Sequence, residues 1–416
     1  MIFSPRRLVA LLVVVAALLC PRSASAYSVL AHEAMVDALW EKEIAPLLRE
    51  RFPALTEAAI LEARAHAYGG SVIQDLGYYS FGNKLFSNLV HYVRSGDFVA
   101  SLLREAKDAN ELAFAIGALA HYASDNTGHP MGTNKVVPLV YPKLRAEFGD
   151  EVVYAHAPSR HVMVEFSFDV LQVGSGAYNA DAYKNFIGFA VPVPHLERAF
   201  IATYGLELDD VFLDVDLAIG SYRRAVSTTI PEMTRLAWED KQEEIRQRIP
   251  NVEQSAFVFT LTRPEYDKAY GTQYQKPSLI SRILFWLLKI LPKIGPLRPL
   301  AFTPLTAEAA KLYTASFAAS IDRYRELLAA AARAQGAAAN TDLDTGQPPA
   351  VVANPLVDET YVDLVDKLRS TKMPLPDALR ADLTAYFAAP ARAGLSGSER
   401  RRLQKARERW AAVRGQ

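Results

Sequence analysis

Apolar residues recur along most of the chain at intervals of three and four positions, which is the spacing of an amphipathic helix. The pattern is clear at the start, in Leu30, Met35, Leu39 and Trp40. It is longest over 306–334, in a stripe made of Tyr313, Phe317, Ile321, Tyr324 and Leu328. The alternation typical of strands is confined to a few residues such as Phe257–Leu261. The pattern predicts an all-α protein.

Breaks in this pattern give the expected helix boundaries. A helix over 54–66 is expected to end at Gly69-Gly70, and two helices are expected within 101–125. Further helices are predicted over 180–189, 196–204 and 231–248, and two or three more after 355. Because residues 336–355 are rich in Gly, Asn, Asp, Thr and Pro, they predict a linker or long surface loop.

Two apolar stretches differ from these helices. Arg6-Arg7 precedes the run Leu8–Leu19, and Ala24-Ser25-Ala26 supplies the small residues of a cleavage site. We therefore expect residues 1–26 to be a signal peptide, cleaved after Ala26, and the protein to be secreted or periplasmic. The second stretch, Leu279–Leu291, is too short to span a bilayer. Arg282 and Lys289 within it, with more basic residues up to position 299, fit either a helix at a membrane interface or one docked on the protein.

Composition narrows the class of protein. The chain has 416 residues with 46 basic and 46 acidic side chains, and signal cleavage would remove three arginines and no acid, which leaves 43 against 46. A chain with such balanced charges has no strong positive electrostatic field that would attract nucleic acid. Cleavage would also remove Cys20, the only cysteine. An exported chain without disulfides needs other sources of stability, and bound metal is one.

The densest candidate chemistry lies in Gly117–Pro130. His121 and Asp125 are four residues apart after a run of helix formers, so both side chains should emerge from one helical face. His129 follows four residues later, between Gly128 and Pro130. We expect the helix to end there, so that the His129 side chain points away from the helix axis. Imidazole and carboxylate donors at this density suit zinc. The alternative is a helix with two incidental histidines.

A second pair with the same spacing supports the metal interpretation. His161 and Glu165 are also four residues apart, so both side chains should lie on one helical face and could bind the same metal ion. His32 lies just after Tyr27, whose amino group would become the new terminus and could chelate a metal together with its carbonyl. Asp75, in a predicted loop, and His91, in an apolar setting, are weak candidates when taken alone. His66, His156 and His195 do not lie in comparable settings.

The order of these residues resembles that of the zinc-dependent phospholipase C family and the related secreted single-strand nucleases, which are all-helical enzymes with three clustered zinc ions. The resemblance covers about residues 27–171. It implies a multi-helix orthogonal bundle over 27–250, to which the chain adds a helical extension over 251–335, the linker over 336–355 and C-terminal helices over 356–416. It also implies the zinc ligands Tyr27, His32, Asp75, His91, His121, Asp125, His129, His161 and Glu165.

Residue by residue, the resemblance assigns one zinc to Asp75, His91, His121 and Asp125. A second would take His129, His161 and Glu165. The third would take the backbone amine and carbonyl of Tyr27, with His32 and a bridging oxygen of Asp125. Asp75 would also stand near the attacking water, as ligand or general base.

Three features depart from the family pattern. Tyr27 stands where many members have tryptophan, although the ligands would be backbone atoms. The gap from Asp125 to His129 is short and looks like that of the glycosylphosphatidylinositol-specific phospholipase D relatives, so the bond that is cleaved stays open. Glu165, in place of aspartate, looks more like the phospholipases than the nucleases.

These features predict an exported zinc phospholipase C that acts on phosphodiesters of lipid head groups. A nuclease with the same mechanism is one alternative, and nucleic acid is the less favoured substrate. A non-catalytic, zinc-stabilised lipid-surface module is another. Contact with the membrane through Leu279–Leu291 would suit a phospholipid substrate, with a helix docked on the protein as the alternative, and the sequence leaves the oligomeric state open.

Overall fold

The computed structural model describes residues 29–175, 190–226, 238, 242–243, 245–246, 305–333, 338–349, 354–371, 373–390 and 396–414. Within these residues every regular element is a helix and no strand occurs, which confirms the all-α prediction. None of the helices in these ranges combines the length and apolar character that crossing a bilayer requires. The predicted signal peptide, Tyr27, the helices over 180–189 and 278–299, and most of 231–248 lie outside the described residues.

The helices before the first long gap are α2 (Val29–Leu39), η1 (Trp40–Ile44), α3 (Ala45–Arg51), α4 (Glu57–Ile73), η2 (Gln74–Tyr78), α5 (Lys84–Tyr92), α6 (Ser95–Glu105), α7 (Ala109–Gly128), η3 (His129–Thr133), α8 (Asn134–Val140), α9 (Pro142–Phe148), η4 (Tyr154–His156) and α10 (Pro158–Ser175). Those after it are α12 (Val193–Tyr204), α13 (Leu208–Val211), α14 (Val215–Arg224), α19 (Ala307–Ala332), α20 (Pro355–Leu368), α21 (Asp377–Ala388) and α22 (Gly397–Val413).

Helices α4 and α7 form the most extensive helix pair in the described part of the chain. Glycines allow their backbones to touch. A Cβ atom on Gly70 would lie 1.8 Å from Phe114 O, and one on Gly117 would lie 1.9 Å from Ala67 O. This close crossing carries the carboxyl end of α4, with Asp75 just beyond it, to the part of α7 that bears His121.

The expected end of the helix at Gly69-Gly70 was wrong, because α4 continues through both glycines to Ile73. Glycine does weaken an isolated helix. Here the absent side chains permit the crossing with α7, and the packing gained there outweighs the low helix propensity. Asp75 therefore lies in the 3-10 turn η2 that prolongs the helix, and not in an open loop.

The chain also stays helical at Pro130, where we had expected it to turn away. His129 has φ −61° and ψ −60°, and its N–H still donates to Asp125 O. Proline lacks the N–H of the regular ladder, and a π-helical turn over His129–Thr133 accommodates it before α8 begins. His129 therefore remains beside Asp125.

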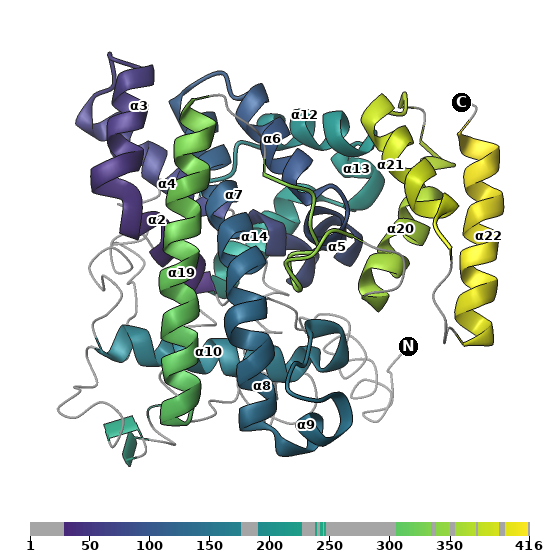
Figure 1. The fold of residues 1–416 in the computed structure, drawn as a ribbon. Coiled ribbons are helices and arrows are strands. Elements are labelled where there is room, and N and C mark those ends of the chain that lie inside the picture. Colours follow the sequence, from purple (N-terminus) through teal and green to yellow (C-terminus); the bar gives the residue numbers. More distant parts are fainter. Residues whose placement is uncertain are drawn as a thin grey trace, which may run out of the picture.

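Helix α19, predicted over 306–334, begins at the cap Thr306 and packs along α7, with further contacts to α2, α8 and η3 (Figure 1). Helix α10 crosses behind the lower halves of α19 and α8 in the same view and contacts α8. Helices that run in such different directions agree with the predicted orthogonal bundle. Helices α20, α21 and α22 lie together on the right of Figure 1, where α20 contacts α5 and α22 lies outermost.

Candidate metal centre

Eight of the nine predicted ligands lie in the described part of the chain, and all eight side chains are buried. The exposed fraction does not exceed 2% for any of His32, Asp75, His91, His121, Asp125, His129, His161 and Glu165. They come from α2, η2, α5, α7, η3 and α10. Burial of so many ionisable groups costs free energy unless they are paired or bind a metal. The ninth, Tyr27, falls among the residues that are not described.

The eight residues gather into three groups, each with one donor atom per residue within 4.8 Å of the others. The first group contains Asp75, His91 and His121. The other two consist of His32, His121 and Asp125, and of His129, His161 and Glu165. The structure therefore brings together the residues that the resemblance had assigned to common ions, although their roles as ligands remain a prediction.

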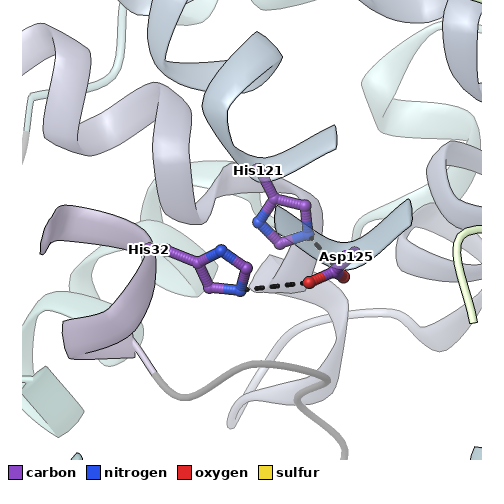
Figure 2. Close-up of side chains that lie close together, drawn as sticks. All are labelled: His32, His121 and Asp125. Atoms are coloured by element: carbon purple, nitrogen blue, oxygen red, sulfur yellow. Dashed lines mark ion pairs between the residues drawn. The ribbon is translucent and has the colours of Figure 1, made fainter. Parts of the chain in front are cut away.

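Asp125 is the centre of this cluster. His121 Nε2 lies 3.2 Å and His91 Nε2 3.3 Å from its Oδ2. Its other oxygen, Oδ1, lies 3.6 Å from His32 Nε2 and 3.8 Å from His129 Nε2. Figure 2 shows the neighbouring rings of His32 and His121 beside the Asp125 carboxylate. A carboxylate that faces four imidazoles from two sides has the placement of a bridging ligand.

Each of the five histidines is oriented by a hydrogen bond from the ring nitrogen that points away from the cluster. Since a carbonyl oxygen can only accept, that nitrogen carries the proton and the other is left with a lone pair. The acceptors are Ser87 O for His91 Nδ1 (2.7 Å), Ser71 O for His121 Nδ1 (2.9 Å), Val152 O for His161 Nε2 (2.6 Å), Ser124 Oγ for His32 Nδ1 (2.7 Å) and Asp344 Oδ1 for His129 Nδ1 (3.1 Å).

The Ser124 hydroxyl itself donates to His121 O at 3.0 Å, so its oxygen accepts from His32. In its neutral form each of the five rings would therefore present a lone pair inward, which is the form that binds zinc.

The donor atoms that point into the cluster have the arrangement expected of metal ligands. Neither carboxylate oxygen of Glu165 finds a hydrogen-bond partner among the described residues, and the same holds for His161 Nδ1. His91 Nε2 and His121 Nε2 are only 3.2 Å apart, although both rings already donate through Nδ1. Two neutral imidazoles in that form cannot hydrogen-bond to each other. A proton on His121 Nε2 can join the two nitrogens in the absence of metal, and a zinc ion that takes both lone pairs would replace that proton.

Without metal, the pKa values of the clustered groups are shifted in different directions. Burial raises the pKa of Glu165 well above its usual range, and the charges of Asp125 and Asp75 raise it further. Burial also lowers the pKa of His161 to about 4. Burial opposes charge on His121 as well, but Asp125 and Asp75 outweigh it and raise that pKa to about 9. A bound divalent cation would favour the ionised form of Glu165 and so lower the pKa of its carboxyl group.

A small pocket opens onto the cluster. It is lined by the rings of Tyr78, Tyr92 and Tyr154, by His91 and His129, and by Asp344. Aromatic walls beside convergent polar groups are typical of a ligand site.

Asp344 is the residue of this site that the sequence analysis missed. It lies in the predicted linker, 215 positions after His129, and is only 3% exposed. The only hint in the sequence is the pair Asp342 and Asp344 shortly before Gly346, which is typical of a turn. The remaining histidines lie elsewhere, as expected: His66 bonds to Glu62 O, His156 stacks on Phe148, and His195 faces Glu111.

Comparison with protein families agrees with the motifs. Residues 31–213 match the model of the family described as zinc dependent phospholipase C. The matched range contains all eight described candidate ligands, whereas Tyr27 and Asp344 lie outside it. Neither the curated proteins nor the solved structures gave a match to the chain.

Proposed function

From the match of residues 31–213 to the zinc-dependent phospholipase C family, which implies a phosphodiester hydrolase, we propose that the protein hydrolyses phospholipid head-group phosphodiesters with three zinc ions. The observation that carries the proposal is the convergence of eight buried donors, far apart in sequence, into three adjoining groups. The balanced charge of the chain adds nothing in favour of a nucleic-acid substrate.

The ligand sets follow from these groups. Asp75, His91, His121 and Asp125 would hold one zinc, and His129, His161 and Glu165 a second. His32 and the second oxygen of Asp125 would hold the third, together with the backbone of Tyr27. Bound zinc would supply charge neutralisation at the phosphate and a water of lowered pKa.

The chain's own residues would orient and deprotonate the reactants. The Asp75 carboxylate lies 3.6 Å from His91 Nε2 and 3.9 Å from His32 Nε2, within the ring of imidazoles. We assign it the role of ligand or proton acceptor for the attacking water. The rings of Tyr78, Tyr92 and Tyr154 would limit the access of other water to the pocket.

Two assays before and after chelation test this function against its alternatives. The purified protein would be given phosphatidylcholine vesicles and, separately, single-stranded DNA. Release of a phosphorylated head group that a chelator abolishes and zinc restores supports the proposal. A free head group instead would indicate cleavage of the D-type bond. DNA cleavage alone would favour the nuclease, and cleavage of neither substrate by fully metallated protein would favour a binding module.

Export is the second part of the proposal. It rests on the signal-peptide pattern of residues 1–26 and on the use of the Tyr27 amino group as a ligand. The N-terminal residue of protein isolated from outside the cytoplasm should be Tyr27. An intact Met1, or cleavage at a distant position, would contradict both export by this signal and the third ligand set.

A further inference from the structure

A segment beyond the matched family region takes part in the candidate metal centre. We call residues 338–349, which lie between α19 and α20, the strap. Tyr122 Oη donates to Ala339 O at 2.8 Å, and Thr341 Oγ1 donates to Asn126 Oδ1 at 2.8 Å. Both partners belong to α7, so the strap lies along the helix that carries His121 and Asp125.

The same end of the strap also contacts α6. Asn340 Oδ1 accepts from Asp97 N at 2.9 Å, and Asn340 Nδ2 donates to Asp97 Oδ2 at 2.9 Å. Gly96 makes room for the strap, because a Cβ atom there would lie 2.0 Å from Ala338 O. The hydrogen bonds and the close approach at Gly96 therefore fix the position of the strap on the helices.

The strap reaches two of the candidate ligands. Leu343 N donates to His91 O at 3.1 Å. The Asp344 carboxylate accepts from His129 Nδ1 through Oδ1 (3.1 Å) and from Tyr154 N through Oδ2 (2.9 Å). Both carboxylate oxygens are thus engaged on the wall of the pocket, where the side chain is almost fully buried.

A local turn holds Asp344 in place. Asn134 Nδ2 donates to its carbonyl at 2.7 Å, and its N–H donates to Asp342 Oδ1 at 2.9 Å. Asn354 Nδ2, at the start of α20, donates to Asp342 Oδ2 at 3.0 Å. The turn closes at Gly346, whose φ of 70° is in the left-handed region that glycine tolerates. These hydrogen bonds therefore hold Asp344 beside His129.

We propose that Asp344 is a positioning residue for the metal group of His129, His161 and Glu165, and that the strap thereby makes the C-terminal region part of a centre whose described candidate ligands all lie within residues 31–213. The inference rests on the proposed zinc site. A carboxylate that accepts from Nδ1 fixes the tautomer of an imidazole, orients its ring and increases the basicity of Nε2. Loss of such a partner typically lowers metal affinity about 10- to 100-fold.

The test is Asp344→Asn, which keeps the shape of the side chain. An amide has one acceptor oxygen, so it cannot serve both His129 Nδ1 and Tyr154 N. If its NH₂ group faces His129 it donates to Nδ1, which moves the ring proton to Nε2 and blocks the ligand atom. We expect the affinity for one zinc ion to fall about 10- to 100-fold, measured by competition with a chromogenic chelator, while the other ions keep their affinities.

Asn340→Ala is the matched control, because it removes two hydrogen bonds from the same strap without touching His129. Thermal unfolding of both variants reports any shared loss of stability, but only Asp344→Asn should lose zinc affinity. Zinc loss of equal size in both would mean that the strap is only a scaffold, and would overturn the proposal.

The double variant His129→Ala with Asp344→Asn gives a second readout. If Asp344 acts through His129, the double variant should bind zinc no more weakly than His129→Ala alone. Additive losses would contradict this. Zinc bound equally well by wild type and Asp344→Asn overturns the role of Asp344 alone, whereas a wild type that binds no zinc overturns the proposed function and this inference with it.

Discussion

At the scale of single residues, the site depends on where each proton resides. Backbone carbonyls hold the outer nitrogens of His91, His121 and His161, and side-chain oxygens do the same for His32 and His129. Four-residue spacing predicted that His121 lies beside Asp125 on one helical face, and His161 beside Glu165. The resemblance to the family supplied the other members of the cluster. The sequence could not predict their acceptors, because a carbonyl such as Val152 O is supplied by every residue type and is placed only by the fold.

Removal of the central carboxylate should be more harmful than removal of a peripheral one. Asp125 lies within 4 Å of four imidazoles, whereas Glu165 forms a single such contact among the described residues, with His161 at 4.0 Å. We expect Asp125→Asn to release more than one zinc and to lower hydrolysis by more than the about 100-fold that an outer-shell change costs. Glu165→Gln should release a single zinc. Zinc per chain and hydrolysis rates measure both variants, and an equal or larger loss in Glu165→Gln would contradict the bridging role.

At the scale of elements, two local rules were overridden by packing. Gly69-Gly70 did not end α4, because the crossing with α7 requires small residues, and Pro130 did not end the helical path, because a π-turn accommodates it. Propensity describes an isolated segment, and neither feature can be read from the segment alone. The long α19 was predicted well, because its apolar stripe and its cap Thr306 agree with each other.

The α4–α7 crossing gives a prediction about stability. Gly70→Ala should lower the free energy of unfolding by about 1–3 kcal/mol or more, since the new methyl group meets Phe114 O. Gly220→Ala in α14 is the control, because no atom lies within 4 Å of its Cβ position and alanine favours a helix by about 0.5–1 kcal/mol. Thermal or denaturant unfolding compares the two. A Gly70→Ala protein as stable as Gly220→Ala would show that the helices are not in backbone contact.

At the scale of the whole molecule, the metal centre joins distant parts of the chain. Its candidate ligands extend from α2 to α10, and Asp344 adds the strap. The family pattern made the ligand set predictable. The role of the strap was not, because residues 336–355 have the composition of a linker and their burial depends on partners such as Ser95 and Asp97, far earlier in the sequence.

Zinc should therefore stabilise the entire fold. A ligand that binds only the folded state adds about 4 kcal/mol when its concentration is about 1,000 times its Kd. Treatment with a strong chelator should lower Tm by several degrees, and added zinc should restore it. The same chelator already saturated with zinc should have no effect. An unchanged Tm in protein shown to have lost its metal would mean that the buried donors do not depend on zinc for their stability.

The most direct test of the central claim is a crystal structure with anomalous diffraction recorded at the zinc absorption edge. We expect three peaks, with imidazole nitrogens about 2.0–2.1 Å from the ions. They should lie among the side chains of His32, Asp75, His91, His121, Asp125, His129, His161 and Glu165. One peak should lie beside His129 Nε2, on the opposite side of the ring from Asp344. A zinc-grown crystal that shows these side chains in place and no peak among them would contradict the account.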